Sequence, residues 1–297
     1  MNEFNTVGVI GKAKSAQMAP LLRALHRQLR KRGCTVLFER ETARLLRGER
    51  VEAVTRDRLA QRADLAVVLG GDGTLLNAGR SLAPAGVPLL GVNQGRLGFM
   101  VDIAPEEMRD TLDAVLDGRY VRERRLLLSA QVRRRSGRVE KPFLAINDVV
   151  LRHRAAVRML EFETWLDDEF ISQHRADGII VSTATGSTAY ALSGGGPVLH
   201  PGLDAVALVP ICPHALADRP VVVSGDRVVR LVLGGGRGTR AMCTGDGQHN
   251  VTLAAGDSVA ISRSEHVLEL IHPENYQYFN ILRKKLQWGR ERASGRS

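Results

Sequence analysis

The chain has 297 residues, of which 44% are hydrophobic and 25% are charged, as is ordinary for a globular protein of one large or two medium domains. No apolar run approaches the roughly 20 residues that a membrane-spanning helix requires, which argues against a membrane protein. The first residues lack the pattern of a signal peptide and lead directly into an apolar run, so we expect a cytoplasmic protein.

The formal net charge of +10 suits either a nucleic acid or an anionic small molecule as the binding partner. Arginine is concentrated in residues 122–125, 133–138 and 283–296, but aromatic residues make up only 4% of the chain and do not interleave with these runs. No helix-turn-helix, zinc finger or RNA-binding aromatic motif is visible. We therefore expect phosphorylated substrates and no nucleic-acid partner.

The cysteines give no sign of a metal centre or of a disulfide framework. Cys34, Cys212 and Cys243 show neither metal-ligand spacing nor a paired arrangement. The sequence therefore predicts no metal ligands, and we interpret the three cysteines as small core residues.

The first third of the chain alternates between predicted strands and helices. Short apolar runs predict strands at residues 7–10, 35–38, 65–69 and 87–92. Apolar residues at helical spacing predict one helix from Met18 to Leu29, stopped by Gly33, and a second one from Met108 to Leu116 that ends at Gly118. This alternation predicts a Rossmann-like α/β domain whose ligands bind at the carboxyl ends of parallel strands.

A glycine-rich turn follows the third of these strands and precedes a helix. It reads Gly70-Gly71-Asp72-Gly73-Thr74. Glycines let the backbone approach an anion closely, and a helix N-terminus offers free N–H donors, so the turn is a candidate phosphate loop. A carboxylate repels phosphate, so Asp72 needs another role: it could bind a metal ion, accept a hydroxyl proton or cap the helix.

Two familiar nucleotide patterns are excluded. A Walker A loop fails around Gly11-Lys12, because Thr6 replaces its first glycine and Ala13 its hydroxyl residue. A dinucleotide fingerprint starting at Gly71 fails because Leu76 occupies the third glycine position.

From about residue 120 the chain changes to short strand-like runs separated by turns such as Gly225-Asp226. The runs are residues 126–133, 144–152, 160–166, 179–182, 205–210, 221–223, 228–233, 241–244 and 267–271. They predict a mostly-β, sandwich-like domain over residues 121–275, which follows an α/β domain over residues 1–120. A helical pattern through Phe279, Leu282 and Leu286 predicts that the tail, residues 276–297, packs back on the first domain.

A second motif lies at residues 177–190 and reads Asp-Gly-Ile-Ile-Val-Ser-Thr-Ala-Thr-Gly-Ser-Thr-Ala-Tyr. It predicts a strand, a hydroxyl-rich turn and a short helix from Ser187 to Leu192. Its hydroxyl groups suit ribose and phosphate oxygens, or they could simply stabilise a turn that caps the helix.

Together the two motifs resemble those of bacterial-type NAD kinases over nearly the whole chain. Residues 91–99, 145–150 and 211–216 and Asp246-Gly247-Gln248 also match that family. The GGDG turn alone is shared with lipid kinases and phosphofructokinases, so the 177–190 stretch carries the specificity. The chain departs from the family in Asp148, where glutamate is usual, and in Ala184, where proline is usual; both put doubt only on fine geometry.

The resemblance implies an enzyme of NADP biosynthesis that transfers the γ-phosphoryl group of ATP to the 2′-hydroxyl of the adenosine ribose of NAD. It also implies a divalent metal ion, Mg²⁺ bound with ATP, and a homo-oligomer, a dimer or tetramer. We keep two alternatives: a lipid or sphingoid-base kinase, and a non-catalytic nucleotide sensor, although a sensor would be expected to lose Asp72.

The resemblance assigns roles to individual residues. Asp72 would be the general base, with Gly73 shaping its loop. The other residues that would bind the dinucleotide are Asn147, Asp148, Arg158, Arg175, Asp177, Thr188, Ala189, Tyr190, Ala191, Leu192, Ser193 and Gln248. Tyr190 would stack on the adenosine and Gln248 would close the site, whereas we expect His174 and His214 to be structural.

Overall fold

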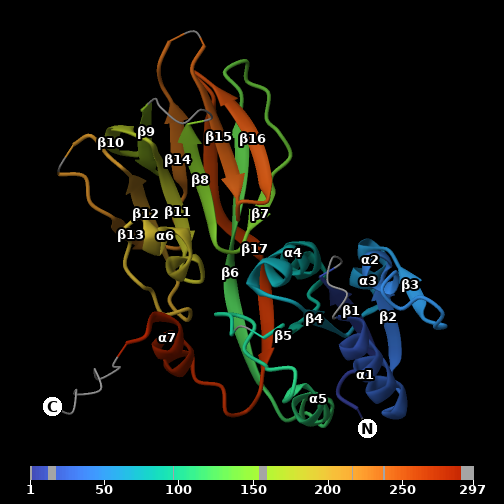
Figure 1. The fold of residues 1–297 in the computed structure, drawn as a ribbon. Helices are drawn as coiled ribbons and strands as arrows, with labels where there is room; N and C mark the ends of the chain where they lie inside the picture. The colour runs from blue at the N-terminus through green and yellow to red at the C-terminus, as the bar shows by residue number, and fades with distance from the viewer. Residues whose placement is uncertain are drawn as a thin grey trace, which may run out of the picture. The chain divides into compact units, whose positions relative to one another are not determined.

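The computed structural model describes residues 2–12, 18–95, 97–153, 159–215, 217–236 and 238–288. Its contacts divide the chain into two compact units: unit 1, residues 1–123 with 269–297, and unit 2, residues 124–268 (Figure 1). No described helix has the length and apolar character that crossing a bilayer requires.

Unit 1 contains a parallel sheet with strand order β17-β5-β4-β1-β2-β3. The strands are β1 (Thr6–Gly11), β2 (Thr35–Glu39), β3 (Glu52–Val54), β4 (Leu65–Leu69), β5 (Leu89–Val92) and the end of β17 (Ser258–His272). The five residues of β4 are all buried, as expected for an apolar strand in the middle of a parallel sheet. This order confirms the predicted α/β class.

The strand order places a topological switch point between β1 and β4. From β1 the chain builds β2 and β3 on one side, and it then returns to β4 and β5 on the other. The last residues of the two strands, Gly11 and Leu69, are direct neighbours in the sheet. In open α/β sheets such a point is where ligands bind.

The helices of unit 1 are α1 (Met18–Lys31), α2 (Arg40–Ala43), α3 (Arg56–Arg62), α4 (Asp72–Leu82), α5 (Met108–Leu116) and α7 (Tyr278–Leu286), with a 3₁₀ turn η1 (Ala83–Ala85). Both helices predicted from apolar periodicity are present. In α1 the side chains of Met18, Leu22, Leu25 and Leu29 are buried in the core. Strand β3 and helices α2 and α3 were not predicted, because they are too short to show a periodic apolar pattern.

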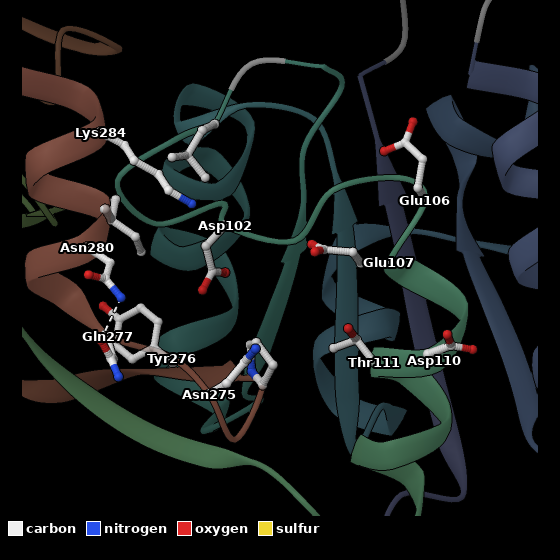
Figure 2. A pocket seen from close by; sticks show the side chains of 13 residues that line it. Asp102, Glu106, Glu107, Asp110, Thr111, Asn275, Tyr276, Gln277, Asn280 and Lys284 are labelled. Atoms are coloured by element: carbon white, nitrogen blue, oxygen red, sulfur yellow. Dashed lines mark hydrogen bonds between the residues drawn. The ribbon is translucent and has the colours of Figure 1, made fainter. Parts of the chain in front are cut away.

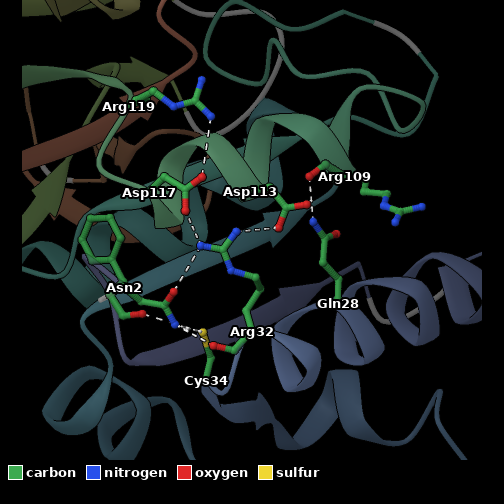
Figure 3. Close-up of polar contacts among 9 residues, drawn as sticks. Asn2, Gln28, Arg32, Cys34, Arg109, Asp113, Asp117 and Arg119 are labelled. Carbon is green, nitrogen blue, oxygen red and sulfur yellow. Dashed lines mark hydrogen bonds and ion pairs between the residues drawn. The ribbon is translucent and has the colours of Figure 1, made fainter.

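Polar contacts tie the end of α1 to α5 and to the N-terminal segment (Figure 3). The Arg32 guanidinium forms ion pairs with Asp113 at 3.1 Å and with Asp117. Asn2 donates from Nδ2 to the backbone carbonyl of Arg32 at 2.8 Å, and Gln28 donates to the carbonyl of Arg109 at 2.7 Å. These contacts hold the outer layer of helices together beside a cavity of about 400 Å³ between α1 and α5.

The tail helix belongs to unit 1, although its buried face differs from the predicted one. Tyr278, Ile281 and Leu282 are buried, whereas Phe279 is 56% exposed. The described helix ends at Leu286, inside the predicted range of 276–297, and residues 289–297 lie outside the described part of the chain.

Unit 2 consists of two packed antiparallel sheets. One sheet has the order β13-β12-β11-β8-β15-β16. Its strands are β8 (Asp148–His153), β11 (Gly178–Thr183), β12 (Ala205–Ile211), β13 (Val221–Ser224), β15 (Arg240–Gly245) and β16 (His249–Ala254). The other contains β6 (Val121–Arg133), β7 (Phe143–Ala145), β9 (Leu160–Leu166), β10 (Glu169–Ala176), β14 (Val229–Leu233) and part of β17.

Both sheets contribute side chains to one apolar core. Val149, Val181 and Leu208 come from the first sheet, and Phe162 and Leu231 come from the second. The predicted sandwich-like, mostly-β class is therefore confirmed.

Three local predictions in unit 2 were wrong. The run 144–152 forms two strands, β7 and β8, with a break at Ile146-Asn147. The helix predicted from Ser187 to Leu192 is split at Ala189 into a 3₁₀ turn, η2 (Gly186–Thr188), and α6 (Tyr190–Ser193). Strand β10 was missed because most of its side chains are exposed and polar, which leaves no apolar alternation to detect. Strand β16 was missed although Val251 and Leu253 alternate with polar residues in it.

Cys34 and Cys243 are buried as predicted, but Cys212 is exposed. Cys212 follows β12 with a φ of 46°, and this left-handed turn carries its side chain out of the core.

Candidate active site

The glycine-rich turn joins β4 to α4 at the switch point. Gly71 is the N-cap of α4, and Asp72 is the first helical residue. Gly70 packs tightly, because a Cβ there would lie 2.6 Å from Oγ1 of Thr74. Gly73 and Thr74 line a cavity of about 340 Å³ together with Gly11 and Lys12. Arg56 and the acidic residues Glu39 and Glu41 also line it, so the helix N-terminus and the two basic residues are the parts of this cavity that suit phosphate.

The Asp72 carboxylate is held by the loop that follows β5. Its Oδ2 accepts the N–H of Phe99 at 2.9 Å, and its Oδ1 accepts the N–H groups of Met100 and Val101 at 3.1 and 3.2 Å. The interpretation of Asp72 as a helix cap is wrong, because α4 has no side-chain cap.

Gly98 permits this close approach. A Cβ at Gly98 would lie 2.2 Å from Oδ1 of Asp72, and the three nearest atoms all belong to that carboxyl group. Any larger residue at position 98 would therefore displace the carboxylate or the loop that holds it.

A second cavity, of about 310 Å³, lies in unit 2 and contains several predicted site residues. Asn147, Asp148, Ala189 and Tyr190 line it, as the family resemblance implied that these residues would lie in one site. Sequence reasoning missed the others that line it, which are Val150, Arg152, Thr244, Asp246, Gly247 and Asn250. The Asp246-Gly247 turn was a usable signal, since it forms part of a motif that matches the family.

Two buried polar groups of this cavity are candidates for ligand contacts. Oδ1 of Asn147 is buried without a hydrogen-bond partner in the described part of the chain. Asp148 is only 5% exposed. Burial, together with the charge of Asp246, raises the pKa of its carboxyl group to about 7. Buried polar groups of this kind are expected to meet a ligand or water.

The hydroxyl-rich turn uses its hydroxyl groups internally. Thr183 donates to the carbonyl of Ile146 at 2.6 Å and accepts the N–H of Gly186 at 3.0 Å. Ser187 donates to the carbonyl of Ala184 at 2.6 Å and accepts the N–H of Leu199 at 2.9 Å. These hydroxyl groups shape the turn that presents Ala189 and Tyr190.

Close packing fixes the same turn. A Cβ at Gly186 would lie 2.0 Å from the carbonyl oxygen of Asn147, so only glycine fits against that strand break. Tyr190 is 45% exposed and available for stacking, whereas Ala191 is fully buried and offers a ligand only its backbone.

The remaining predicted site residues do not line this cavity. Arg175 is an exposed residue of β10 whose guanidinium lies 3.5 Å from Glu161, and Asp177 is exposed between β10 and β11. Gln248 closes the β15–β16 turn next to Gly247, and its N–H donates to the carbonyl of Gly245 at 2.9 Å. Thr188, Leu192 and Ser193 flank the two residues of that segment that line the cavity. Arg158 lies outside the described residues.

His174 makes side-chain contacts inside unit 2, and His214 contacts Arg175 through its backbone. His174 is buried, contacts Asp218 at 3.1 Å through Nδ1 and stacks on Phe162. The backbone N–H of His214 donates to the carbonyl of Arg175 at 2.8 Å. Within the described residues no three His, Cys, Asp or Glu side chains are arranged to hold a metal ion.

Comparison with known proteins gives the family. The ATP-NAD kinase N-terminal domain matches residues 7–120, and the ATP-NAD kinase C-terminal domain matches residues 146–273. The chain belongs to the ATP-NAD kinase family. It is therefore an enzyme of the kinase class, as the resemblance implied, and neither the lipid-kinase nor the sensor alternative is supported.

Close relatives span the whole chain. The NAD kinase of Teredinibacter turnerae is 45% identical over 288 residues, which cover 97% of this chain and 98% of that protein. The NAD kinase of Hahella chejuensis is 44% identical over 295 residues and covers 99% of both chains.

Solved structures share the fold. An NAD kinase from Archaeoglobus fulgidus in complex with ATP is 26% identical with a TM-score of 0.74, and the match covers 95% of this chain and 98% of that one. Yeast NADH kinase complexed with NADH has a TM-score of 0.91 at 21% identity, with 100% and 91% of the two chains covered, and it shows the fold alone.

Proposed function

We propose that the enzyme transfers the γ-phosphoryl group of ATP to the 2′-hydroxyl of the adenosine ribose of NAD and so produces NADP. The observation that carries this proposal is the 310 Å³ cavity of unit 2, in which Oδ1 of Asn147 has no partner and Asp148 is buried. Membership of the ATP-NAD kinase family identifies the dinucleotide that would satisfy them.

NAD would place its adenosine in this cavity. The unpartnered oxygen of Asn147 would accept an O–H or N–H of the ribose or adenine, and the Asp148 carboxylate would accept another. The exposed ring of Tyr190 supplies a flat apolar surface for stacking. A volume of about 310 Å³ is at the lower end of the range for small-molecule pockets and suits one nucleoside.

Asp72 would act as the general base. The 2′-hydroxyl proton passes to the Asp72 carboxylate, the hydroxyl oxygen forms a bond to the γ-phosphorus, and the bond to the β–γ bridging oxygen breaks to release ADP. The N–H groups of Phe99, Met100 and Val101 keep the carboxylate oriented. Orientation matters because phosphoryl transfer passes through a loose transition state in which the proton leaves late.

The switch-point cavity of unit 1 would bind phosphate groups. Gly73 and Thr74, in the first turn of α4, and the basic residues Lys12 and Arg56 line it. Mg²⁺ would enter as the ATP complex, as the family resemblance implies. The ion would neutralise charge on the transferred phosphoryl group.

Further parts of the proposal rest on the resemblance. Residues 121–275 would form the dinucleotide-binding domain. The additional contacts to NAD would come from Arg158, Arg175, Asp177, Thr188, Ala191, Leu192, Ser193 and Gln248. The enzyme would act in the cytoplasm as a homo-oligomer, a dimer or tetramer.

One assay tests the central proposal. Purified enzyme is mixed with NAD, ATP and Mg²⁺, and NADP is measured with an NADP-specific dehydrogenase. We expect NADP and ADP in equal amounts. If ADP forms without NADP, the acceptor has been assigned wrongly; if neither forms, the chain does not catalyse this transfer.

A further inference from the structure

Asp246 lines the cavity proposed for NAD, but the proposed mechanism gives it no role. It opens the turn between β15 and β16, two neighbouring strands of unit 2 (Figure 1). Asp246 and Gly247 have φ angles of 49° and 63°, and the turn is closed by the Gln248 N–H. Aspartate, asparagine and glycine are the residues that tolerate such angles.

The Asp246 carboxylate holds the break between β7 and β8. It accepts the N–H of Ile146 at 3.1 Å, that of Asn147 at 2.7 Å and that of Asp148 at 3.2 Å. Its own N–H donates to the carbonyl of Asp148 at 3.0 Å. The backbone that presents the two proposed NAD-binding side chains is therefore fixed from both directions by one residue.

The same carboxylate acts electrostatically on its neighbour. Burial, and after it the negative charge of Asp246, raises the pKa of Asp148 to about 7. The other titratable side chains that line the cavity are Arg152, on β8, and Tyr190, on α6. A proton on Asp148 near neutral pH would remove the negative charge that strengthens its hydrogen bond to NAD.

We propose that Asp246 is a positioning residue of the NAD site, which fixes Asn147 and Asp148 by holding their backbone N–H groups and acts on Asp148 through its charge. This inference rests on the proposed function. It follows that the affinity for NAD falls on acidification, because protonated Asp148 loses its negative charge and can then accept only a weaker, neutral hydrogen bond.

Two substitutions separate the charge from the backbone contacts. Asp246→Asn keeps one acceptor oxygen and the left-handed turn but removes the charge. Asp246→Gly keeps the left-handed turn but removes both the charge and the acceptor oxygens. The matched control is Asp167→Asn, because Asp167 also has a positive φ, of 51°, and its carboxylate accepts a backbone N–H, that of Val228, at 2.8 Å without lining the cavity.

The measurement is kcat and KM for NAD at saturating Mg–ATP from pH 6 to pH 8. Because NAD binding favours the ionised form of Asp148, a pKa of about 7 makes KM of the parent enzyme up to about tenfold higher at pH 6 than at pH 8. We expect this ratio to shrink to about two- to threefold in Asp246→Asn and to stay unchanged in Asp167→Asn. Asp246→Gly should also raise KM at pH 8 about tenfold while kcat changes less than about threefold.

Two results would overturn the inference. One is a parent-like pH dependence of KM in Asp246→Asn, even if that variant melts at a lower temperature, because a purely structural role would produce this. The other is unchanged KM in Asp246→Gly. Either result leaves NADP formation by the parent enzyme intact, whereas a parent enzyme that makes no NADP contradicts the proposed function itself.

Discussion

Asp72 and Asp246 use the same hydrogen-bonding pattern in the two units of the chain. Each carboxylate accepts three consecutive backbone N–H groups, those of residues 99–101 for Asp72 and those of residues 146–148 for Asp246. Hydrogen bonds from backbone N–H groups to a carboxylate are charge-assisted and roughly twice as strong as neutral ones. Each carboxylate can therefore hold a loop in place.

Substitution of Asp72 tests the proposed base. We expect Asp72→Asn to lower kcat by about 10²- to 10⁴-fold, the usual effect of losing a general base. NAD binding should persist, because its proposed contacts lie in unit 2. Since asparagine has one acceptor oxygen and Asp72 uses both of its own, thermal unfolding must accompany the kinetics. Near-parental turnover with no NAD binding would make Asp72 a binding residue and exclude it as the base.

Gly98 offers a second test of the Asp72 site. An alanine Cβ would meet the Asp72 carboxyl group at 2.2 Å, while the backbone of Gly98 has no left-handed φ to strain. We expect Gly98→Ala to lower kcat about 10- to 100-fold with little change in KM for NAD, because a shift of about 1 Å in a reacting group has this effect. Gly236→Ala, which has no atom within 4 Å and no positive φ, is the control. Equal kcat in both variants would contradict the prediction, because it would show that the loop accommodates the alanine Cβ without moving the Asp72 carboxylate.

The buried carboxyl group of Asp148 should make stability depend on pH. Its pKa is about 7 when folded, against an ordinary 3.8, so between these values the folded chain holds a proton that the unfolded chain has lost. The free energy of unfolding therefore falls as pH rises through this window, by at most about 1.4 kcal/mol per unit.

Asp148→Asn should remove that dependence. Relative to the parent, the variant should gain about 2–4 kcal/mol in the free energy of unfolding between pH 4 and pH 8. Urea unfolding at several pH values measures the difference. NAD affinity should decline at the same time, since the amide carries no charge. Parallel stability curves for the two proteins would contradict the prediction.

Among the elements of unit 1, the end of β17 is fixed by a buried histidine. The His272 side chain is 1% exposed and lies 3.1 Å from Asp102, after β5, and 3.1 Å from Glu123, on β6. Its ring stacks on Tyr276 at 3.8 Å. Burial lowers the pKa of His272, but the contacts with both carboxylates outweigh it and raise the pKa above its usual value. The three segments are thus joined through one imidazole ring, whose charged form the two carboxylates favour.

Loss of this histidine should destabilise unit 1 in a pH-dependent way. Because the pKa of His272 is raised in the folded chain, its contribution to the free energy of unfolding is complete below about pH 6.5. This contribution is lost as pH rises through the folded-state pKa. We expect His272→Gln to unfold about 3 kcal/mol more easily than the parent at pH 6, with a smaller deficit at pH 9. Chemical denaturation at the two pH values measures both. A larger deficit at pH 9 would contradict the assignment of charge.

His272 contacts two residues that line a further cavity of unit 1. Asp102 and Tyr276 line this space of about 520 Å³, and Figure 2 shows them between α7, which carries Asn280 and Lys284, and α5, which carries Asp110 and Thr111. Residue Leu97 of the same cavity directly precedes Gly98. Asp102, which contacts His272, directly follows Val101, whose N–H donates to Asp72. His272 therefore contacts the loop that holds Asp72.

For the whole molecule, we expect an oligomer. The six-stranded sheet of unit 2 ends at β13, where Val221 and Val222 are 46% and 44% exposed. An apolar sheet edge is a common site of association between chains. Sedimentation of active enzyme should give a dimer or tetramer, and Val222→Lys should shift it toward a monomer. Val139→Lys, at a valine that is 44% exposed outside β13, is the control. A parent enzyme that sediments as an active monomer would contradict the prediction.

The sequence by itself determined the fold class, the family and the motifs. Fully apolar strands such as β4 and regular apolar spacing as in α1 are local signals, because the period of the pattern reflects burial of one face. The GGDGT turn and the 177–190 stretch identified the family because each is contiguous in the chain.

Only the tertiary structure decided how distant residues meet. The hydrogen bonds between Asp72 and residues 99–101 join groups 27 to 29 positions apart in the chain. The hydrogen bonds between Asp246 and residues 146–148 join groups 98 to 100 positions apart. The break between β7 and β8 and the buried charge of His272 likewise depend on partners from other strands. No local pattern encodes such contacts, because packing brings the groups together only after the strands have found their neighbours.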